Sequence, residues 1–171
     1  MNKFKLSVIV PIYNTGKFLS KCLDKILEQK YKDFELILVN DASTDNSHDI
    51  CNFYSKKRNV TLINNEKNFG VVSSCLAGIN SAKGDYLCFV DSDDFIEYDY
   101  FTQINRIIDN VKPDIIIFGY NTINNDKLIK HSSNNFNLEG LYENDRIVNV
   151  KSNLISNQVL NYELMHYIVS A

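Results

Sequence analysis

The most informative absence in this sequence is that of a long apolar run. No stretch approaches the roughly 20 residues that a helix needs to cross a bilayer, so we do not expect an integral membrane protein. Tryptophan is absent, and only two prolines and six glycines occur in 171 residues, which excludes a fibrous or disordered composition. The formal net charge is only −3, and this argues against a general nucleic-acid binder, because such proteins carry a basic face.

Signal-peptide and metal-binding cysteine patterns are also missing. The apolar run after Lys3 and Lys5 is too short for a signal core and is broken by Pro11, so we interpret it as a buried strand. The cysteines show no CxxC pair and no metal-ligand spacing, and without a secretory signal they are expected to be reduced core thiols of a cytoplasmic protein. They are Cys22, Cys51, Cys75 and Cys88.

Buried strands and amphipathic helices alternate over the first 120 residues. Continuous β-branched runs predict strands buried on both faces, and apolar residues at helical spacing predict the helices between them. Short links between such elements indicate right-handed βαβ units, and therefore an α/β fold with a mostly parallel sheet flanked by helices. Strands are predicted at residues 5–12, 34–39, 60–63, 86–90 and 114–120, and helices at 18–27, 49–54, 71–82 and 100–111.

The alternation stops after Tyr120. Residues 121–139 are rich in Asn, Ser and Lys and suggest loops with an exposed hairpin, and residues 143–168 show weaker helical periodicity. No linker precedes this part. We therefore expect one compact domain, with residues 1–120 as its core and residues 121–171 as a short, irregular and helical C-terminal region.

The acidic run Asp91-Ser92-Asp93-Asp94 is the sharpest candidate site. It directly follows the fourth strand, and ligands of open parallel sheets bind beyond the carboxyl ends of the strands. Three carboxylates in four residues repel one another unless a cation or ligand offsets them, and Mg²⁺ is usually held by one or two carboxylates plus substrate phosphates. The alternative is a solvated acidic turn that caps the helix beginning near Tyr98.

Two other strand ends favour a nucleotide ligand. Tyr13 offers an aromatic face for stacking on a base, and Asp41 offers an acceptor for a base or ribose donor. Either residue alone is more simply explained by a turn or cap, but together with the acidic run they favour nucleotide binding. The sequence has no GxGxxG after the first strand and no GxxxxGK[ST] loop, which argues against NAD-binding and P-loop proteins.

Four ordered motifs resemble those of family 2 glycosyltransferases with the GT-A fold. They are SVIVPIYN at 7–14, ELILVNDASTD at 35–45, Asn68-Phe69-Gly70, and AKGDYLCFVDSDD at 82–94. The resemblance covers residues 5–120. It implies binding of a nucleotide-sugar, usually a UDP-sugar, and transfer of the sugar to an acceptor hydroxyl with inversion.

The resemblance also implies roles for individual residues. Pro11 and Tyr13 would lie against the base, and Asp41 would accept a hydrogen bond from the uracil imide. Asp91 and Asp93 match the DxD motif, whose first carboxylate lies near the ribose and sugar and whose second binds Mg²⁺ or Mn²⁺; both are predicted metal ligands. The predicted donor-binding residues are Pro11, Tyr13, Asn14, Asp41, Asn68, Gly70, Asp91 and Ser92.

The sequence departs from the family pattern at two places. Members commonly have Ala-Arg-Asn where residues 74–76 read Ser-Cys-Leu, so Cys75 replaces a cation that would face the donor. Their Asp-Asp-Gly-Ser reads Asn-Asp-Ala-Ser at residues 40–43, which keeps the carboxylate expected at the base.

The general base that inversion requires is not identified. We expect it beyond residue 171, with Glu163 as a weak candidate. The other acids and histidines of the C-terminal region are expected to be surface or packing residues. These are Glu139, Glu143, Asp145, His131 and His166.

The sequence therefore predicts a metal-dependent inverting glycosyltransferase of surface polysaccharide biosynthesis, acting on a glycan or lipid-linked glycan acceptor. Residues 121–171 would be a partial acceptor-side region of a truncated chain. The alternative is a nucleotide-sugar-binding module or fragment that lacks its general base. We expect a cytoplasmic location, where residues 159–169 could pack on the core or touch the inner face of the membrane or a partner.

Overall fold

The computed structural model describes residues 4–117, 120–124, 127–132 and 167–170, with side chains described through Ile116. The chain divides into two compact units, one formed by Met1–Ile116 with Ile168–Ala171 and the other by Ile117–Tyr167. The division into residues 1–120 and 121–171 within one domain stays a prediction. In the part of the chain that is described, no helix is both long and apolar enough to span a bilayer.

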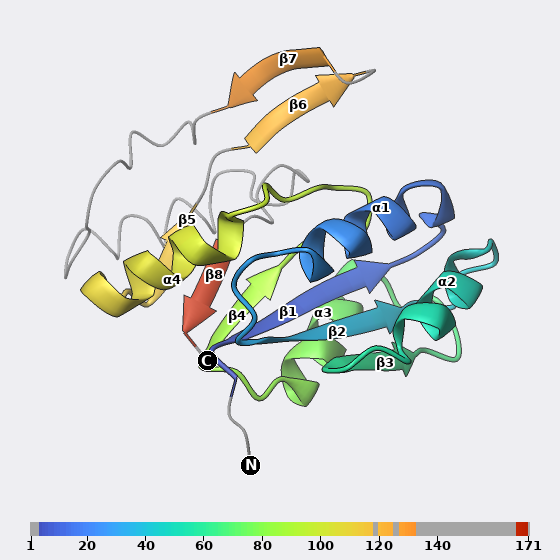
Figure 1. Ribbon diagram of the computed structural model, residues 1–171. Coiled ribbons are helices and arrows are strands. Elements are labelled where there is room, and N and C mark those ends of the chain that lie inside the picture. Colours follow the sequence, from blue (N-terminus) through green and yellow to red (C-terminus); the bar gives the residue numbers. More distant parts are fainter. Residues whose placement is uncertain (1–3, 118–119, 125–126, 133–166, 171) are drawn as a thin grey trace, which may run out of the picture. The chain divides into compact units, whose positions relative to one another are not determined.

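The first unit is built on a six-stranded sheet of order β3-β2-β1-β4-β8-β5 (Figure 1). The four strands β3, β2, β1 and β4 are parallel, and β8 runs antiparallel to β4. The predicted α/β fold with a mostly parallel sheet is therefore confirmed. The strands are β1 (Leu6–Ile12), β2 (Phe34–Asn40), β3 (Val60–Asn64), β4 (Tyr86–Phe89), β5 (Ile115–Ile117) and β8 (Tyr167–Ser170).

Helices cover both faces of this sheet. Helix α3 (Val71–Ser81) packs on β1 and β2, where a Cβ at Gly78 would meet the Ile9 side chain. Phe34 pairs with Leu6 in register, and alternation along β1 puts Leu6 on the face opposite to Ile9. Phe34 contacts Phe101 of α4 (Tyr100–Val111), with 5.0 Å between ring centroids, so α4 lies on the face away from α3.

Helix α1 (Gly16–Leu27) is tied to α4 by one buried side chain. Gln29, which is fully buried, accepts a hydrogen bond at Oε1 from the Phe101 N–H (3.1 Å) and donates through Nε2 to the Glu97 carbonyl (2.6 Å). Helix α2 (Ser47–Tyr54) contacts α1, β2 and β3. Because all residues of β1 and β2 are buried, both faces of the central strands contribute to one apolar core.

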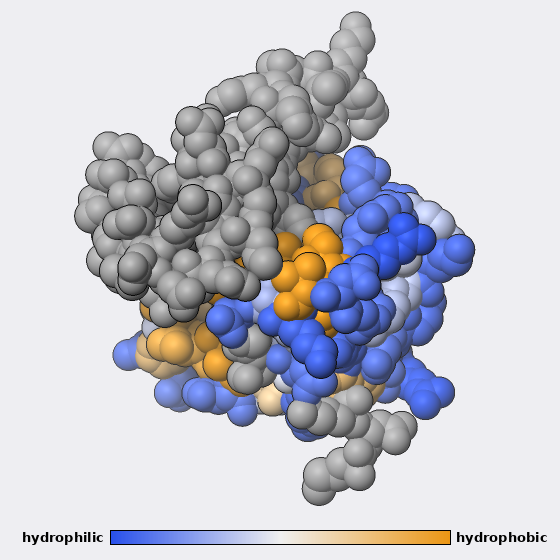
Figure 2. All heavy atoms as spheres, turned by 90° about the vertical axis from the view of Figure 1, so that its left-hand side faces the viewer, coloured by the Kyte–Doolittle hydropathy of each residue, from blue (hydrophilic) through white to orange (hydrophobic). Residues whose placement is uncertain are grey.

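Seen from the side in Figure 2, the described surface is largely hydrophilic, and apolar side chains are exposed at separate places on it. The second unit contains the antiparallel hairpin of β6 (Tyr120–Asn124) and β7 (Lys127–Ser132), as the composition of residues 121–139 suggests. The strand predicted at 114–120 contains β5 at Ile115–Ile117, and residues 118–119 lie outside the described part of the chain. The helical periodicity extended to residue 168 is wrong at its end, where Tyr167–Ser170 is a strand.

Candidate functional site

The strand order reverses between β1 and β4, since β1 leads to β2 on one side and β4 lies on the other. Crevices at such reversals, beyond the carboxyl ends of the strands, are where open α/β sheets bind ligands. One hydrogen bond crosses this point, from Thr15 Oγ1 to Ser92 Oγ at 2.9 Å. The Cys22 thiol also donates to the Asp91 carbonyl at 3.5 Å, so the loop after β4 is held against the first turns of α1.

Asp41, directly after β2, organises the loop that leads from β3 to α3. Its carboxylate accepts hydrogen bonds from the backbone N–H groups of Phe69 (3.0 Å) and Gly70 (2.8 Å) and from Asn65 Nδ2 (2.6 Å). Asn68 is exposed, and its side-chain oxygen shares the Gly70 N–H at 2.9 Å. The predicted residues Asp41 and Asn68 thus meet at the N–H group of Gly70, the third of them.

The hydrogen bonds decide the charge state of Asp41. Burial by itself would raise the pKa of this carboxyl, but the donors of Phe69, Asn65 and Gly70 stabilise the ionised form, and the net pKa is lowered. The Ser74 side chain also contributes a hydrogen bond that lowers this pKa, and the Asp41 side chain is buried. Asp41 is therefore a charged, hydrogen-bonded group at the carboxyl edge of the sheet.

The loop after β1 presents Tyr13 to solvent. The Tyr13 side chain is 47% exposed, whereas Pro11 is buried within β1. Asn14 has a left-handed backbone (φ 54°), and its side-chain oxygen accepts a hydrogen bond from the Thr44 N–H at 2.8 Å. Tyr13 is thus available for stacking, while the side-chain oxygen of Asn14 connects two loops.

The acidic run after β4 forms a turn, in which the Asp94 N–H donates to the Asp91 carbonyl at 3.0 Å. Asp93 is exposed, and Asp91 and Asp94 are half-buried. The turn does not cap a helix, because α4 begins only at Tyr100 with Asp99 as its N-cap residue. The alternative explanation of the run as a cap for this helix is therefore wrong.

The carboxylates of this acidic turn raise the pKa of cysteine thiols in α1 and α3. Burial raises the pKa of the Cys22 thiol to about 12, and the three carboxylates add to the effect. Burial, reinforced by Asp91, raises the pKa of Cys75 to about 11. Position 75, where the resemblance expects an arginine, therefore lies within electrostatic reach of Asp91. All four cysteines are free thiols, and Cys75 is the least buried of them.

The acidic turn fits a hard divalent cation by the chemistry of its donors. Mg²⁺ is held in proteins by one or two carboxylates together with water and substrate phosphates, and Asp91 and Asp93 supply that kind of ligand. Within the described residues, no three His, Cys, Asp or Glu side chains gather as a complete metal cage. A cation at this turn would therefore depend on oxygen ligands from the substrate.

The structure reveals contacts that the sequence patterns do not single out. Thr15 and Asn65 hold Ser92 and Asp41, respectively, and neither belongs to the motifs as the resemblance reads them. The sequence could have indicated these two residues only through their positions, shortly after the end of β1 and directly after the end of β3. The catalytic candidate Glu163 lies outside the described residues, as do Glu139, Glu143, Asp145 and His166; the side chain of His131 is not described.

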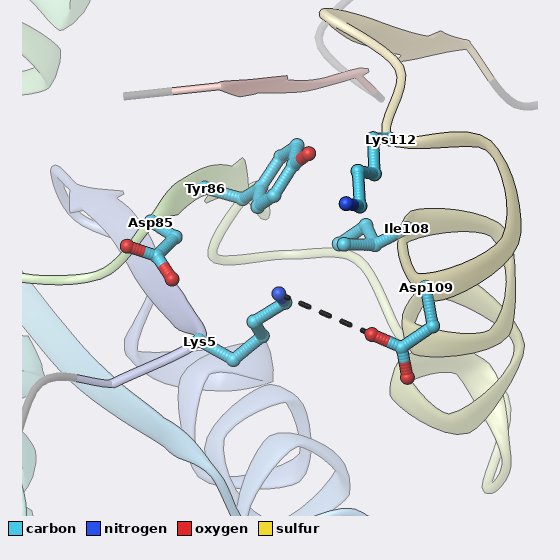
Figure 3. Close-up of a pocket in the computed structure, with 6 residues that line it drawn as sticks. All are labelled: Lys5, Asp85, Tyr86, Ile108, Asp109 and Lys112. Atoms are coloured by element: carbon cyan, nitrogen blue, oxygen red, sulfur yellow. Dashed lines mark ion pairs between the residues drawn. The ribbon is translucent and has the colours of Figure 1, made fainter.

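A pocket of about 340 Å³ lies at the opposite edge of the sheet (Figure 3). It is lined by residues next to the amino ends of β1 and β4 and by the last turn of α4. Lys5 Nζ faces Asp109 Oδ1 at 4.0 Å within it. The lining combines two lysines with two aspartates and lies away from the strand order reversal, so the pocket does not belong to the candidate site.

Residues 7–169 of this chain match a family model that is described as "Glycosyl transferase family 2". The chain is 41% identical over 120 residues to glycosyltransferase GlyA of Streptococcus pneumoniae, covering 70% of this chain and 17% of that protein. It is 44% identical over 96 residues to the poly(ribitol-phosphate) beta-glucosyltransferase of Bacillus spizizenii, covering 54% of this chain and 15% of the relative. The chain thus spans only a small part of the length of these relatives.

Solved structures show the same fold. The crystal structure of S. aureus TarS in complex with UDP-GlcNAc superposes with a TM-score of 0.68 at 29% identity, covering 74% of this chain and 37% of that one. The predicted GT-A architecture is therefore confirmed.

Proposed function

The chain belongs to glycosyl transferase family 2, and from that premise we propose that it binds a UDP-sugar at the carboxyl edge of its sheet and transfers the sugar to an acceptor hydroxyl with inversion. The observation that carries the proposal is the Thr15–Ser92 hydrogen bond, which joins the loops after β1 and β4 at the strand order reversal. In this proposal the base-binding and the acidic residues lie on the two sides of one bound nucleoside diphosphate.

The base lies on the side of β1 and β2 in this proposal. Tyr13 stacks on the uracil ring, next to Pro11, and Asp41 accepts a hydrogen bond from the imide N–H. A charged, fixed acceptor suits this donor, because hydrogen bonds to ionised groups are stronger than those between neutral groups. Asn14, Asn68 and Gly70 shape the walls through their loops.

The diphosphate lies on the side of the acidic turn. Asp91 lies near the ribose and sugar, beside Ser92, and Asp93 with Asp91 would hold Mg²⁺ or Mn²⁺. When bound, the cation would supply positive charge opposite the diphosphate leaving group. Asp91 and Asp93 would otherwise repel the phosphates, so the acidic turn is compatible with this ligand only through such a cation.

Similar proteins support the donor and the pathway. TarS binds UDP and UDP-GlcNAc in its crystal structures, and the Bacillus spizizenii relative acts on poly(ribitol-phosphate). We infer that this chain uses a UDP-sugar and works in surface polysaccharide synthesis, on a glycan or lipid-linked glycan acceptor. A cytoplasmic location belongs to the same proposal.

Calorimetry with UDP, with and without Mn²⁺, tests the donor site. Asp93→Asn should weaken UDP binding in the presence of Mn²⁺ about tenfold, and the affinity without metal should change little. Glu97→Gln, which removes an exposed carboxylate just beyond the acidic turn, is the matched control and should bind as the wild type does. Equal metal dependence in the wild type and Asp93→Asn would contradict the metal assignment.

Turnover decides between the two candidate functions. Release of UDP from a UDP-sugar in the presence of an acceptor glycan supports the transferase. Binding of UDP without turnover for any donor and acceptor would instead favour a nucleotide-sugar-binding module, the alternative that the unidentified general base leaves open. Failure of the wild type to bind any nucleoside diphosphate would overturn both.

A further inference from the structure

The loops after β1 and β2 are joined by reciprocal hydrogen bonds, which we call the loop latch. Three consecutive backbone N–H groups, those of residues 14–16, each donate to a side chain that follows β2. In return, Asn14 Oδ1 accepts from the N–H groups of Thr44 (2.8 Å) and Asp45 (3.3 Å). The acceptors for residues 14, 15 and 16 are Ser43 Oγ (3.1 Å), Ser47 Oγ (3.1 Å) and Asp45 Oδ2 (2.9 Å).

Asp45 is the centre of the loop latch, because one carboxylate serves the N-termini of two helices. Oδ2 accepts from Gly16, the first residue of α1, and Oδ1 accepts from Ser47, the first residue of α2, each at 2.9 Å. Negative charge is stabilised at helix N-termini by the unpaired N–H groups and the helix dipole. Thr15, the N-cap residue of α1, directs its hydroxyl to Ser92 instead, so α1 takes its cap from the neighbouring loop.

The loop latch connects both halves of the proposed donor site. Tyr13 immediately precedes the three latched N–H groups, and Thr15 bonds to Ser92 in the acidic turn. A change in the position of residues 14–16 would therefore move the aromatic ring and the acidic turn together. The carboxylate of Asp45 is itself committed to Gly16 and Ser47, and so it acts on a ligand through these loops rather than by contact.

We propose that Asp45 is a positioning residue for nucleotide binding, which fixes Tyr13 against the base through the loop latch. The inference rests on the proposed function, since it requires that a uracil nucleotide binds beside Tyr13. It predicts that loss of Asp45 weakens nucleotide binding because the Tyr13 ring then contributes less to the binding free energy.

The first measurement is the dissociation constant of UDP in the presence of Mn²⁺. Asp45→Asn keeps the shape of the side chain but brings an NH₂ group against one of the two helix N–H donors. We expect UDP binding about tenfold weaker, the equivalent of one hydrogen bond of ordinary strength. The matched control is Asp49→Asn, which removes an exposed carboxylate from the first turn of the same helix and should bind UDP as the wild type does.

A double-mutant cycle separates positioning from a general structural role. Tyr13→Ala in the wild-type background should cost about tenfold in affinity, a typical loss for an aromatic ring stacked on a base. In the Asp45→Asn background the same change should cost less than about threefold, because the ring is no longer held in place. Additive losses would overturn the positioning role, even if Asp45→Asn lowers stability.

Two further results complete the test. Ser43→Ala removes a single bond of the loop latch and should weaken UDP binding about threefold in a fully folded protein, which covers the case that Asp45→Asn folds poorly. Equal UDP affinity in the wild type and both variants would overturn the positioning role alone. A wild-type protein that binds neither UDP nor another nucleoside diphosphate would overturn the proposed function as well.

Discussion

Two carboxylates, one near the start of β2 and one directly after its end, hold the two ends of α3 at opposite edges of the sheet. At the amino edge, Glu35 is 3% exposed and accepts hydrogen bonds from Ser7 Oγ (2.7 Å) and the Lys83 N–H (2.6 Å), which follows α3. At the carboxyl edge, Asp41 accepts from the N–H groups of Phe69 and Gly70, which precede α3.

The difference lies in what else each carboxylate faces. The cluster around Glu35 is closed within the protein, because Ser7 Oγ also accepts the N–H of the buried residue Gly84 at 2.8 Å. Asp41 is equally buried, at 3% exposed, but the loops that it holds border the proposed donor site. We therefore expect the Glu35 cluster to affect stability alone, and Asp41 to affect both stability and the proposed donor site. Substitutions at the two edges should therefore separate stability from nucleotide affinity.

The largest loss of stability is expected for Glu35→Ala. The substitution removes the acceptor of the Ser7 hydroxyl, leaves the Lys83 N–H with only its longer bond to Ser7 Oγ (3.2 Å) and opens a cavity, so the free energy of unfolding should fall by about 3 kcal/mol. Denaturant unfolding measures the loss. UDP affinity of the folded variant should be unchanged, and Glu28→Ala, an exposed control, should stay within about 0.5 kcal/mol of the wild type. A loss below about 1 kcal/mol would mean that the cluster is not a stabilising contact.

Substitution of the glycines beyond the two ends of α3 should likewise lower stability at both edges but lower UDP affinity at the carboxyl edge alone. A Cβ at Gly84 would lie 2.7 Å from the Leu6 carbonyl carbon and the Ser7 nitrogen, so Gly84→Ala should cost about 2–3 kcal/mol by steric overlap. Gly70 has open space around it but a φ of +85°, and Gly70→Ala should cost about 1–2 kcal/mol through backbone strain. Only Gly70→Ala should also weaken UDP binding, which calorimetry of both variants can check.

Asp41→Asn should have a smaller effect on stability, about 1–2 kcal/mol, because the amide keeps one acceptor for the loop. The effect depends on pH. Since the pKa of Asp41 is lowered in the folded protein, its contribution is complete above the unfolded pKa of about 3.9 and disappears as the pH falls through the folded value. Unfolding curves of the two proteins should therefore converge below about pH 4. A constant difference down to pH 2 would show that the charge is not responsible.

The smallest effect, and the only gain, is expected for Ala42→Gly. Ala42 has a φ of 56°, a left-handed conformation that glycine adopts without a steric penalty, so the substitution should raise the free energy of unfolding by about 0.5–1 kcal/mol. Thermal unfolding would detect the gain. Ala77→Gly within α3 is the opposite control, with an expected loss of about 1 kcal/mol. Loss of stability in both variants would indicate that Ala42 is not strained.

The sequence predicts the core of this fold because local patterns determine it. The β-branched runs of β1 and β2 and the helical spacing in α1 and α4 identify their elements within one or two residues. Chain polarity then places Tyr13, Asp41 and Asp91 at one edge, since the carboxyl ends of parallel strands lie together. Each of these inferences needs only neighbours along the chain.

Contacts between distant loops are not predictable in this way. The Thr15–Ser92 bond, the Asp45 carboxylate between two helices and the Asn65 amide on Asp41 join polar residues that any surface turn could contain. The strand at Tyr167–Ser170 is a further case, because a short apolar run fits a helix or a strand equally well until its partner is known. The roles of the site residues toward a ligand stay predictions.

The position of β8 between β4 and β5 has a consequence for the order in which the sheet is completed. Strands β1–β4 assemble through βαβ units of neighbouring segments, whereas Cys88 of β4 pairs with Ile168, which follows much later in the sequence. Pairings between such distant residues form slowly, and synthesis delivers the amino-terminal strands first. Until β8 arrives, β4 presents an open edge that another chain can extend. Aggregation during synthesis should therefore start from β4, and β8 acts as its natural protection.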